Sequence, residues 1–228
     1  MIRIGGVQGF STVDYPGQLA AVVFLQGCMW SCVYCHNQTL RPMTNLSAMT
    51  FADLEPFLDK RQGRLDAIVF SGGEPLLHKN LAKAMEKVKG YGYKVGMHTT
   101  GSVPDRLKEC LPFVDWLGLD VKHLPRCQEE IVGKPANCLM TWESLKHLLA
   151  SDVDYECRTT VHPDWIEENQ LVELGRQLQS QGVKTWALQR YRSFGNPTSI
   201  VEELAGDWIG QRVAHELSHR FENLILRD

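Results

Sequence analysis

The chain has 228 residues and a formal net charge of -3 at pH 7. That length supports one substantial core, and the even composition predicts a single domain over residues 1–228. The lack of a basic excess argues against nucleic acid as a partner. No apolar run is long enough to cross a bilayer, and residues 1–6 lack the basic-then-apolar order of a signal peptide, so we expect a cytoplasmic protein without membrane contact.

Strand-like and helix-like segments alternate along most of the chain. Pro16-Gly17 marks a turn inside an opening strand pair, and Thr50 with Asp53 has the spacing of a capping box, which predicts a helix to about Arg61. The expected strands are 2–8, 19–26, 65–70, 94–98, 116–121, 155–161 and 185–189, and the further helices are 81–89, 104–110, 141–150, 167–181 and a mostly helical extension over about 198–228.

About six strand-helix units predict an α/β fold with a parallel sheet and right-handed crossovers. Without an obvious reversal of strand order, we expect a partial barrel of six units, TIM-like in kind, rather than a flat doubly wound sheet. In such a barrel the chemistry lies where the strands end. The unusual residues of this chain follow the expected strands, which predicts one site at that rim.

Three of the seven cysteines lie close together, at Cys28, Cys32 and Cys35. Three thiolates at this spacing can bind one corner of an iron–sulfur cluster and leave its fourth iron open. The alternative is a structural zinc site completed by His36, but such sites usually take a ligand pair from a distant segment. The remaining cysteines have no paired spacing and are expected to be isolated thiols: Cys110, Cys127, Cys138 and Cys157.

Three further motifs follow expected strands. Gly72-Gly73-Glu74-Pro75 allows close backbone approach and offers acceptors for an ammonium group, or is merely a Gly-Gly-Pro turn. Asp120 and Lys122 alternate by two and so point the same way, toward a small charged ligand or simply into solvent. Arg158 lies inside the apolar-flanked strand expected at 155–161, and a buried arginine needs an anionic partner such as a carboxylate.

Together these motifs resemble the radical S-adenosylmethionine (SAM) enzymes and, within them, the glycyl radical enzyme activases. The resemblance rests on the cysteine spacing with Tyr34, on residues 72–75 and on Asp120-x-Lys122. Residues 9–17 resemble the entry segment of the activases. The compact length is most similar to the activating proteins of anaerobic ribonucleoside-triphosphate reductase, and the likeness covers roughly residues 5–192.

The resemblance implies a radical SAM barrel with one 4Fe-4S cluster on the three cysteines and SAM on its open iron. Reductive cleavage of SAM would give a 5'-deoxyadenosyl radical, which takes hydrogen from a glycine of a large partner enzyme, with an electron donor such as flavodoxin or ferredoxin. The implied cofactor contacts are Tyr34 at the adenine, Gly72, Gly73 and Glu74 at the methionine amine, Arg158 at the carboxylate or ribose, and Thr99, Asp120, Lys122 and Arg192 nearby.

Some residues depart from the activase pattern. His98 replaces an aspartate that pyruvate formate-lyase activating enzymes use at a monovalent cation site, which places that site in doubt here. Arg192 falls where those enzymes have a histidine. Residues 37–49 contain no second cysteine cluster of the kind that many other activases carry.

Other interpretations remain open at this stage. His215-Glu216-x-x-His219 matches a zinc metalloprotease pattern, but no downstream ligand segment follows, so surface histidines are expected. The alternative enzymes are an activase of pyruvate formate-lyase or of another glycyl radical enzyme, and a radical SAM enzyme acting on a small molecule. Outside catalysis, the alternatives are an iron–sulfur electron carrier or sensor and a zinc-stabilised interaction module.

Overall fold

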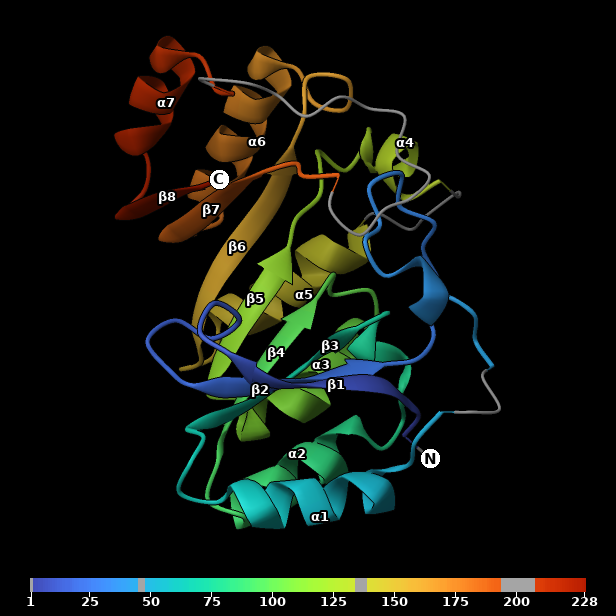
Figure 1. Cartoon of the computed structure of the whole chain (residues 1–228). Coiled ribbons are helices and arrows are strands. Elements are labelled where there is room, and N and C mark those ends of the chain that lie inside the picture. Colours follow the sequence, from blue (N-terminus) through green and yellow to red (C-terminus); the bar gives the residue numbers. More distant parts are fainter. Residues whose placement is uncertain (1, 45–47, 134–138, 194–207) are drawn as a thin grey trace.

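An eight-stranded sheet with its strands in the order β1 to β8 forms the centre of the molecule (Figure 1). The computed structural model describes residues 2–44, 48–133, 139–193 and 208–228. The strands are β1 (Ile4–Ser11), β2 (Ala20–Leu25), β3 (Ala67–Gly72), β4 (Lys94–Thr99), β5 (Trp116–Asp120), β6 (Asp154–Val161), β7 (Thr185–Arg190) and β8 (Asn223–Arg227). The α-helices are α1 (Phe51–Arg61), α2 (Leu81–Gly90), α3 (Pro104–Cys110), α4 (Gln128–Val132), α5 (Leu139–Leu149), α6 (Glu168–Ser180) and α7 (Gln211–Ser218).

The strand pairing confirms the predicted α/β class. β1 pairs antiparallel with β2, as the turn at Pro16-Gly17 predicts. Every later pair, from β2–β3 to β7–β8, is parallel. Because parallel strands need a crossover between them, the connections carry helices, and the carboxyl ends of all these strands meet at one rim.

The sheet curls into an open barrel. α1 and α2 cover it beside the first strands, and α6 and α7 lie against β6 to β8 (Figure 1). β1 and β8 are the two edges of the sheet and do not pair with each other. The fold is thus the expected partial barrel, with an opening between its first and last strands.

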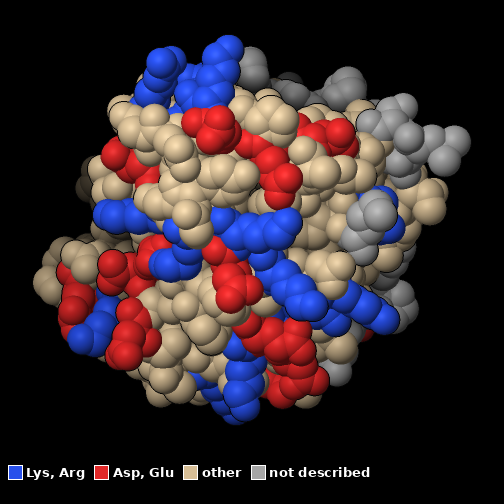
Figure 2. Space-filling view, turned by 90° about the horizontal axis from the view of Figure 1, so that it is seen from below, with Lys and Arg blue, Asp and Glu red and all other residues tan. Residues whose placement is uncertain are grey.

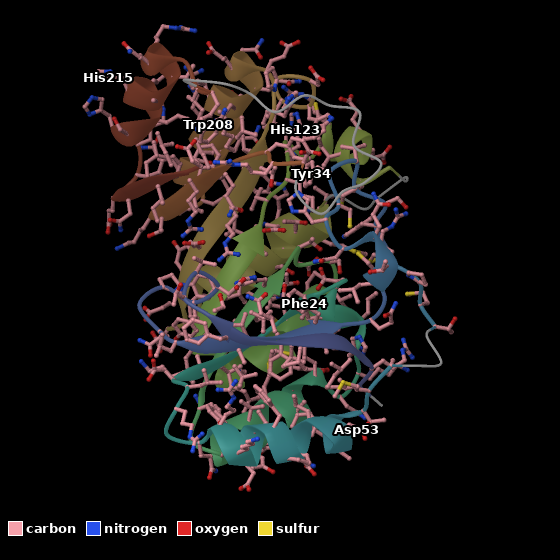
Figure 3. All side chains as sticks on the ribbon, in the orientation of Figure 1. Phe24, Tyr34, Asp53, His123, Trp208 and His215 are labelled. Atoms are coloured by element: carbon pink, nitrogen blue, oxygen red, sulfur yellow. The ribbon has the colours of Figure 1, made fainter. Side chains whose placement is uncertain are left out.

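Helix α1 shows how local sequence fixes an element. The predicted capping box is present, since the Thr50 backbone N–H donates to Asp53 Oδ2 over 2.7 Å. Leu54 and Leu58, one turn apart, are fully buried against the sheet. Asp53 lies at the lower end of the molecule, on the side opposite Tyr34 (Figure 3).

Strand β2 is apolar on both faces because it is covered on both. Val23 and Leu25 belong to the main core between the sheet and the helices. Val22 instead belongs to a smaller cluster with Tyr15 and Trp116 on the other side of the strand. The continuous apolar run that precedes the cysteines is therefore a central strand, which fixes the start of the cysteine loop.

The expectation of a mostly helical extension over residues 198–228 is wrong at its end. α7 is helical, but residues 223–227 form β8, which pairs with β7. The short apolar run Leu224-Ile225-Leu226 completes the sheet instead of extending the helix. The part of that expectation that covers residues 198–207, and the isolated thiol expected at Cys138, lie outside the described residues.

The surface carries both signs of charge. On the face seen from below, basic and acidic side chains are interspersed (Figure 2). One example is the exposed pair of Lys87 and Glu55, whose charged atoms are 3.1 Å apart. None of the helices in the described parts of the chain is long and apolar enough to span a membrane.

Candidate functional site

The three clustered cysteines lie on a loop at the carboxyl end of β2. Backbone hydrogen bonds fix both sides of this loop. On one side, the Cys28 N–H donates to the Arg41 carbonyl over 3.0 Å. On the other, the N–H groups of Ser31 and Val33 donate to Val132 and Ile131 of α4 over 2.8 and 3.0 Å. The loop is thus held to the barrel by a helix about one hundred residues further along the chain, which the sequence did not predict.

The cysteine loop closes one side of a pocket of about 210 Å³, called here the cysteine pocket. Its other sides come from the carboxyl ends of β3 to β6. The lining residues are Cys28, Trp30, Cys32, Tyr34, Cys35, His36, Asn37, Arg41, Gly72, Gly73, Thr100, Asp120, Lys122 and Thr160. The structure therefore brings the cysteine loop, Gly72-Gly73 and the pair of Asp120 and Lys122 together at one rim of the barrel, as the position of these motifs after the strands predicts.

The thiols of the pocket are suited to binding a metal cation. Burial raises the pKa of Cys28 to about 12 and also raises that of Cys32, so neither thiol loses its proton unless a bound cation favours the thiolate. Among the described residues, no three His, Cys, Asp or Glu side chains lie close enough to bind a single ion. In an iron–sulfur cluster, each of the three cysteines would bind a different iron.

Gly72, the last residue of β3, and Gly73 allow the end of this strand to lie close to β2 and the segment that follows it. Gly72 has a φ of 113°, and a β-carbon there would lie 2.3 Å from the Leu25 nitrogen. A β-carbon on Gly73 would lie 2.2 Å from the carbonyl oxygen of Gly27. The predicted close backbone approach is present, and its first consequence is that β3 supports the start of the cysteine loop.

Glu74 and Thr99 were expected to contact the cofactor, but neither side chain lines the cysteine pocket. Glu74 is fully buried, and its carboxylate accepts hydrogen bonds from the Leu76 N–H (3.0 Å), the Thr99 hydroxyl (2.6 Å) and both the N–H and hydroxyl of Thr100 (3.0 and 2.5 Å). These donors engage both oxygens, so Glu74 connects the ends of β3 and β4.

Thr100 and Trp30 are pocket residues that the sequence analysis missed. The Trp30 indole N–H donates to the Thr100 hydroxyl over 3.1 Å, and this hydroxyl in turn donates to Glu74. The chain of hydrogen bonds connects the cysteine loop to the end of β4. The only sequence signal was the position of Thr100 in the Thr-Thr-Gly that follows an expected strand.

Asp120 and Lys122 face the same pocket, as their alternation predicts. Lys122 Nζ lies 3.3 Å from Asp120 Oδ2 and 5.1 Å from the centre of the Tyr34 ring. Burial lowers the pKa of Lys122, the nearby Asp120 carboxylate raises it, and the net pKa is well above its usual value. Lys122 therefore places a buried ammonium beside the cysteines. Burial has the opposite effect on a phenol and raises the pKa of Tyr34, which keeps its hydroxyl neutral.

A second and larger cavity of about 850 Å³ lies next to the cysteine pocket, and His36 and Thr160 line both. We call it the barrel cavity. It occupies the opening between the first and last strands. Its lining residues are Thr12, Val13, Asp14, Pro16, His36, His98, Arg158, Thr160, Gln189, Arg190, Tyr191, Arg192, Arg227 and Asp228.

Arg158 has the anionic partner that its burial requires, and this partner belongs to the protein. Its Nε lies 2.5 Å from Glu156 Oε1, while Arg227 of β8 binds the same carboxylate through two nitrogens, at 2.5 and 2.7 Å. The Arg158 guanidinium also lies over the Trp116 ring at 5.0 Å. A β-carbon on Gly118 would lie 2.7 Å from Arg158 Cζ, so this glycine makes room for the side chain.

Arg192 and His98 also lie in the barrel cavity rather than in the cysteine pocket. The exposed Arg192 accepts a 2.8 Å hydrogen bond from the His36 ring at its backbone carbonyl. The His98 ring donates to the Asp14 carbonyl over 2.8 Å. Burial, reinforced by Arg158, lowers the pKa of His98 well below its usual value. A neutral ring therefore occupies the position for which the resemblance would require a carboxylate.

The metalloprotease-like motif lies away from both cavities. Its two rings contact each other, with their Nε2 atoms 3.2 Å apart, and Glu216 pairs with Arg176 and Arg220. His215 lies on the outer side of α7, far from Tyr34 (Figure 3). These are surface histidines.

Comparison with protein families decides what kind of site this is. The protein-family model described as the radical SAM superfamily matches residues 22–174. This range includes all three cysteines and the strands that line the cysteine pocket. The chain belongs to the radical SAM superfamily. As a radical SAM protein it is an enzyme, and its cofactors are a 4Fe-4S cluster and SAM. Membership removes the zinc module and the non-catalytic electron carrier from the alternatives.

Individual radical SAM relatives refine this assignment. MJ1227 of Methanocaldococcus jannaschii, named as a candidate glycyl-radical enzyme activating enzyme, is 30% identical over 184 residues, covering 76% of this chain and 74% of MJ1227. The pyruvate formate-lyase-activating enzyme of Clostridium pasteurianum is 33% identical over 132 residues, covering 54% of each protein. The chain is therefore similar to glycyl radical enzyme activases.

The radical SAM fold also has solved counterparts. The crystal structure of Streptococcus suis SuiB bound to S-adenosylmethionine superimposes with a TM-score of 0.69 at 14% identity, over 88% of this chain and 48% of SuiB. This chain thus spans about half the length of SuiB. The similarity establishes the shared fold.

Proposed function

We propose that the chain activates a glycyl radical enzyme, with anaerobic ribonucleoside-triphosphate reductase as the partner, by removing a hydrogen atom from a glycine α-carbon. The observation that carries the proposal is the position of the barrel cavity beside the cysteine pocket. Its volume of about 850 Å³ is at the upper end of the range for small-molecule sites, and it lies at the opening of the barrel, where a segment of a protein can enter. The similarity to activases supports the same conclusion.

Each part of the cysteine pocket has a role in this proposal. Cys28, Cys32 and Cys35 would hold the cluster through three irons, and SAM would bind the fourth. The cofactors supply one-electron cleavage of the SAM sulfonium, which yields a radical able to abstract hydrogen. All the positioning comes from the protein.

The protein would bind SAM through groups on the strand ends. Lys122 offers a fixed positive charge to the SAM carboxylate, and Asp120 offers an acceptor. The carbonyl groups of Gly72 and Gly73 replace Glu74 as acceptors for the amine, because the Glu74 oxygens are already bonded. Tyr34, packed 5.2 Å from Trp165, offers an apolar face to the adenine.

Arg158 would act at the boundary between the two cavities. Its Nε is committed to Glu156, and the guanidinium faces the barrel cavity next to Thr160. It would position the ribose or carboxylate end of SAM against the entering glycine. The buried side chains of Trp30, Tyr34 and Tyr191 would help to exclude water from the radical.

A second candidate partner is pyruvate formate-lyase, which the similarity to pyruvate formate-lyase activating enzymes favours. The electron would come from flavodoxin or ferredoxin. Other glycyl radical enzymes, and a small-molecule substrate in the barrel cavity, are distinguished by the same experiment.

The experiment reconstitutes the protein with iron and sulfide without oxygen, reduces it, and adds SAM with each partner in turn. We expect 5'-deoxyadenosine, and a glycyl radical signal by electron paramagnetic resonance with anaerobic ribonucleotide reductase. A signal with pyruvate formate-lyase alone would reassign the partner. Cleavage of SAM without a glycyl signal from any glycyl radical enzyme would contradict activase function.

Matched cysteine variants connect the activity to the site. Cys35→Ser should lose most of the bound iron and all SAM cleavage, because one iron ligand is missing. Cys127→Ser, a buried cysteine outside the pocket, should keep both. Equal iron content in the two variants would contradict the assigned ligands.

A further inference from the structure

The outer edge of β8 is open. β8 is the last strand of the sheet and, in the described parts of the chain, it pairs only with β7. Its sequence includes three consecutive apolar residues, Leu224, Ile225 and Leu226, and Leu226 is 50% exposed. An exposed edge strand presents a row of backbone N–H and C=O groups to which another extended chain can add.

The pairing with β7 identifies which backbone groups are open. The Asn223 N–H donates to the Lys184 carbonyl over 3.0 Å, so Asn223 points its backbone groups toward β7. Successive residues of a strand alternate in this direction. Ile225 therefore also faces β7, whereas Leu224 and Leu226 point their N–H and C=O groups to the open side.

The open edge leads directly into the barrel cavity. Arg227 and Asp228, at the end of β8, line that cavity opposite Asp14 of the connection between β1 and β2. The bonds from Arg227 to Glu156 of β6 hold the end of β8 against the barrel wall. A chain that runs beside β8 would thus be guided over the rim, toward the cysteine pocket.

We propose that an extended segment of the partner protein adds to the edge of β8 as a further strand and that this pairing leads its reacting residue into the barrel cavity. The proposal rests on the proposed function, since it names how the activated protein is recognised. Backbone pairing gives affinity without requiring a particular sequence, and the cavity gives the selectivity.

A second copy of the chain is a weaker occupant of this edge. β8 has five residues, of which Leu224 and Leu226 offer outward hydrogen bonds. Stable protein interfaces bury about 1,200–2,000 Å², far more than such a short strand pair supplies by itself. A partner segment that pairs with β8 and also fills the barrel cavity gains the additional contact area.

Amide hydrogen exchange resolved to single residues tests the pairing. The reconstituted protein is measured alone and with a synthetic peptide spanning the radical glycine of the partner that shows a glycyl signal. We expect exchange at Leu224 and Leu226 to slow roughly tenfold or more, while Ile225, already bonded to β7, changes little. Protection that appears without peptide and grows with protein concentration would instead indicate a second copy and overturn the proposal.

A proline variant tests the outward hydrogen bond of Leu226 through its effect on activation of the partner. Leu226→Pro removes the outward N–H and leaves the bonds to β7 intact, because proline is tolerated at the open side of an edge strand. It should raise the partner concentration for half-maximal activation roughly tenfold and leave SAM cleavage without partner unchanged. Leu226→Ala, which keeps the N–H, should change the partner concentration for half-maximal activation less than about threefold.

The outcomes separate this proposal from the proposed function. Equal losses in Leu226→Pro and Leu226→Ala would show that the side chain, not the backbone, is recognised. A glycyl radical formed by wild type with no change in exchange at Leu224 and Leu226 would overturn strand addition and leave activase function standing. No glycyl radical from wild type with any partner would overturn the function itself.

Discussion

Gly73 lies so close to Gly27 that a β-carbon on it would stand 2.2 Å from the Gly27 carbonyl oxygen. Gly73→Ala should therefore push the start of the cysteine loop away from β3, at a cost of about 1–3 kcal/mol. We expect the reconstituted variant to bind much less iron than wild type, measured as iron per protein. Gly90→Ala is the matched control, since outside the neighbouring backbone of α2 nothing lies within 4 Å of the added carbon. Equal iron content in both variants would contradict this role of Gly73.

Glu74→Gln tests whether this carboxylate is structural. The amide nitrogen that replaces one oxygen cannot accept the bonds that Thr100 donates, and a buried donor left unpaired costs about 1–3 kcal/mol. Urea unfolding of the apoprotein should show that loss, whereas Glu86→Gln, on the exposed face of α2, should be nearly neutral. An unchanged unfolding free energy with a large loss of SAM affinity would instead restore Glu74 as a direct ligand.

Lys122→Met removes the buried ammonium but keeps most of the side-chain volume. Hydrogen bonds to charged groups contribute about 1.5–3 kcal/mol, so SAM affinity of the reconstituted protein should fall by roughly ten- to a hundredfold. Because the pKa of Lys122 is raised, wild-type affinity should not change through this residue between about pH 7 and 9. Lys87→Met, which breaks a surface ion pair, is the control. Calorimetric titration with SAM measures both variants.

Glu156→Gln should destabilise the fold in a pH-dependent manner. Burial raises the pKa of Glu156, but Arg227 and Arg158 outweigh it and the net pKa is lowered. A carboxyl group whose pKa is lower in the folded state than in the unfolded state, where it is about 4.3, stabilises the fold at pH values above that unfolded pKa. This stabilisation is lost as the pH falls through the pKa of the folded state. Removing one partner of a buried ion pair costs about 3–5 kcal/mol.

Unfolding of the apoprotein at several pH values measures this dependence. The difference between wild type and Glu156→Gln should be largest near neutral pH and should shrink below about pH 4. Glu55→Gln, on an exposed pair with Lys87, should differ little from wild type at any pH. A difference that stays constant down to low pH would show that the charge of Glu156 is not what stabilises the fold.

The positions of the motifs could be predicted from sequence because parallel strands end at one rim. The cysteine loop, Gly72-Gly73 and the pair of Asp120 and Lys122 all line the cysteine pocket, as expected. Side-chain direction could not be predicted in the same way. Glu74 begins a short 3-10 turn, Pro75–Leu77, and its carboxylate bonds to that turn instead of entering the pocket. Sequence gives the end of a strand, whereas the following turn decides where the next side chain points.

The ion pairs that join Arg158, Glu156 and Arg227 could be predicted only in part. The partner of Arg158 could have been found, since Glu156 lies two residues before it and therefore on the same face of the strand. Arg227 could not, because the sequence predicted a helix at that position. Short apolar runs such as residues 224–226 are ambiguous between helix and strand, and only the open position beside β7 decides for the strand.

The attachment of the cysteine loop to α4 has a consequence for how the protein loses its metal. Ser31 and Val33 bond to the last residues of this five-residue helix, and Gly133, with a φ of 68°, ends it against Ser31. So short a helix has little stability of its own. Release of iron should therefore unfold both the cysteine loop and residues 128–133. Proteolytic cleavage within residues 128–133 would then report that the cluster has been lost, for example through oxidation.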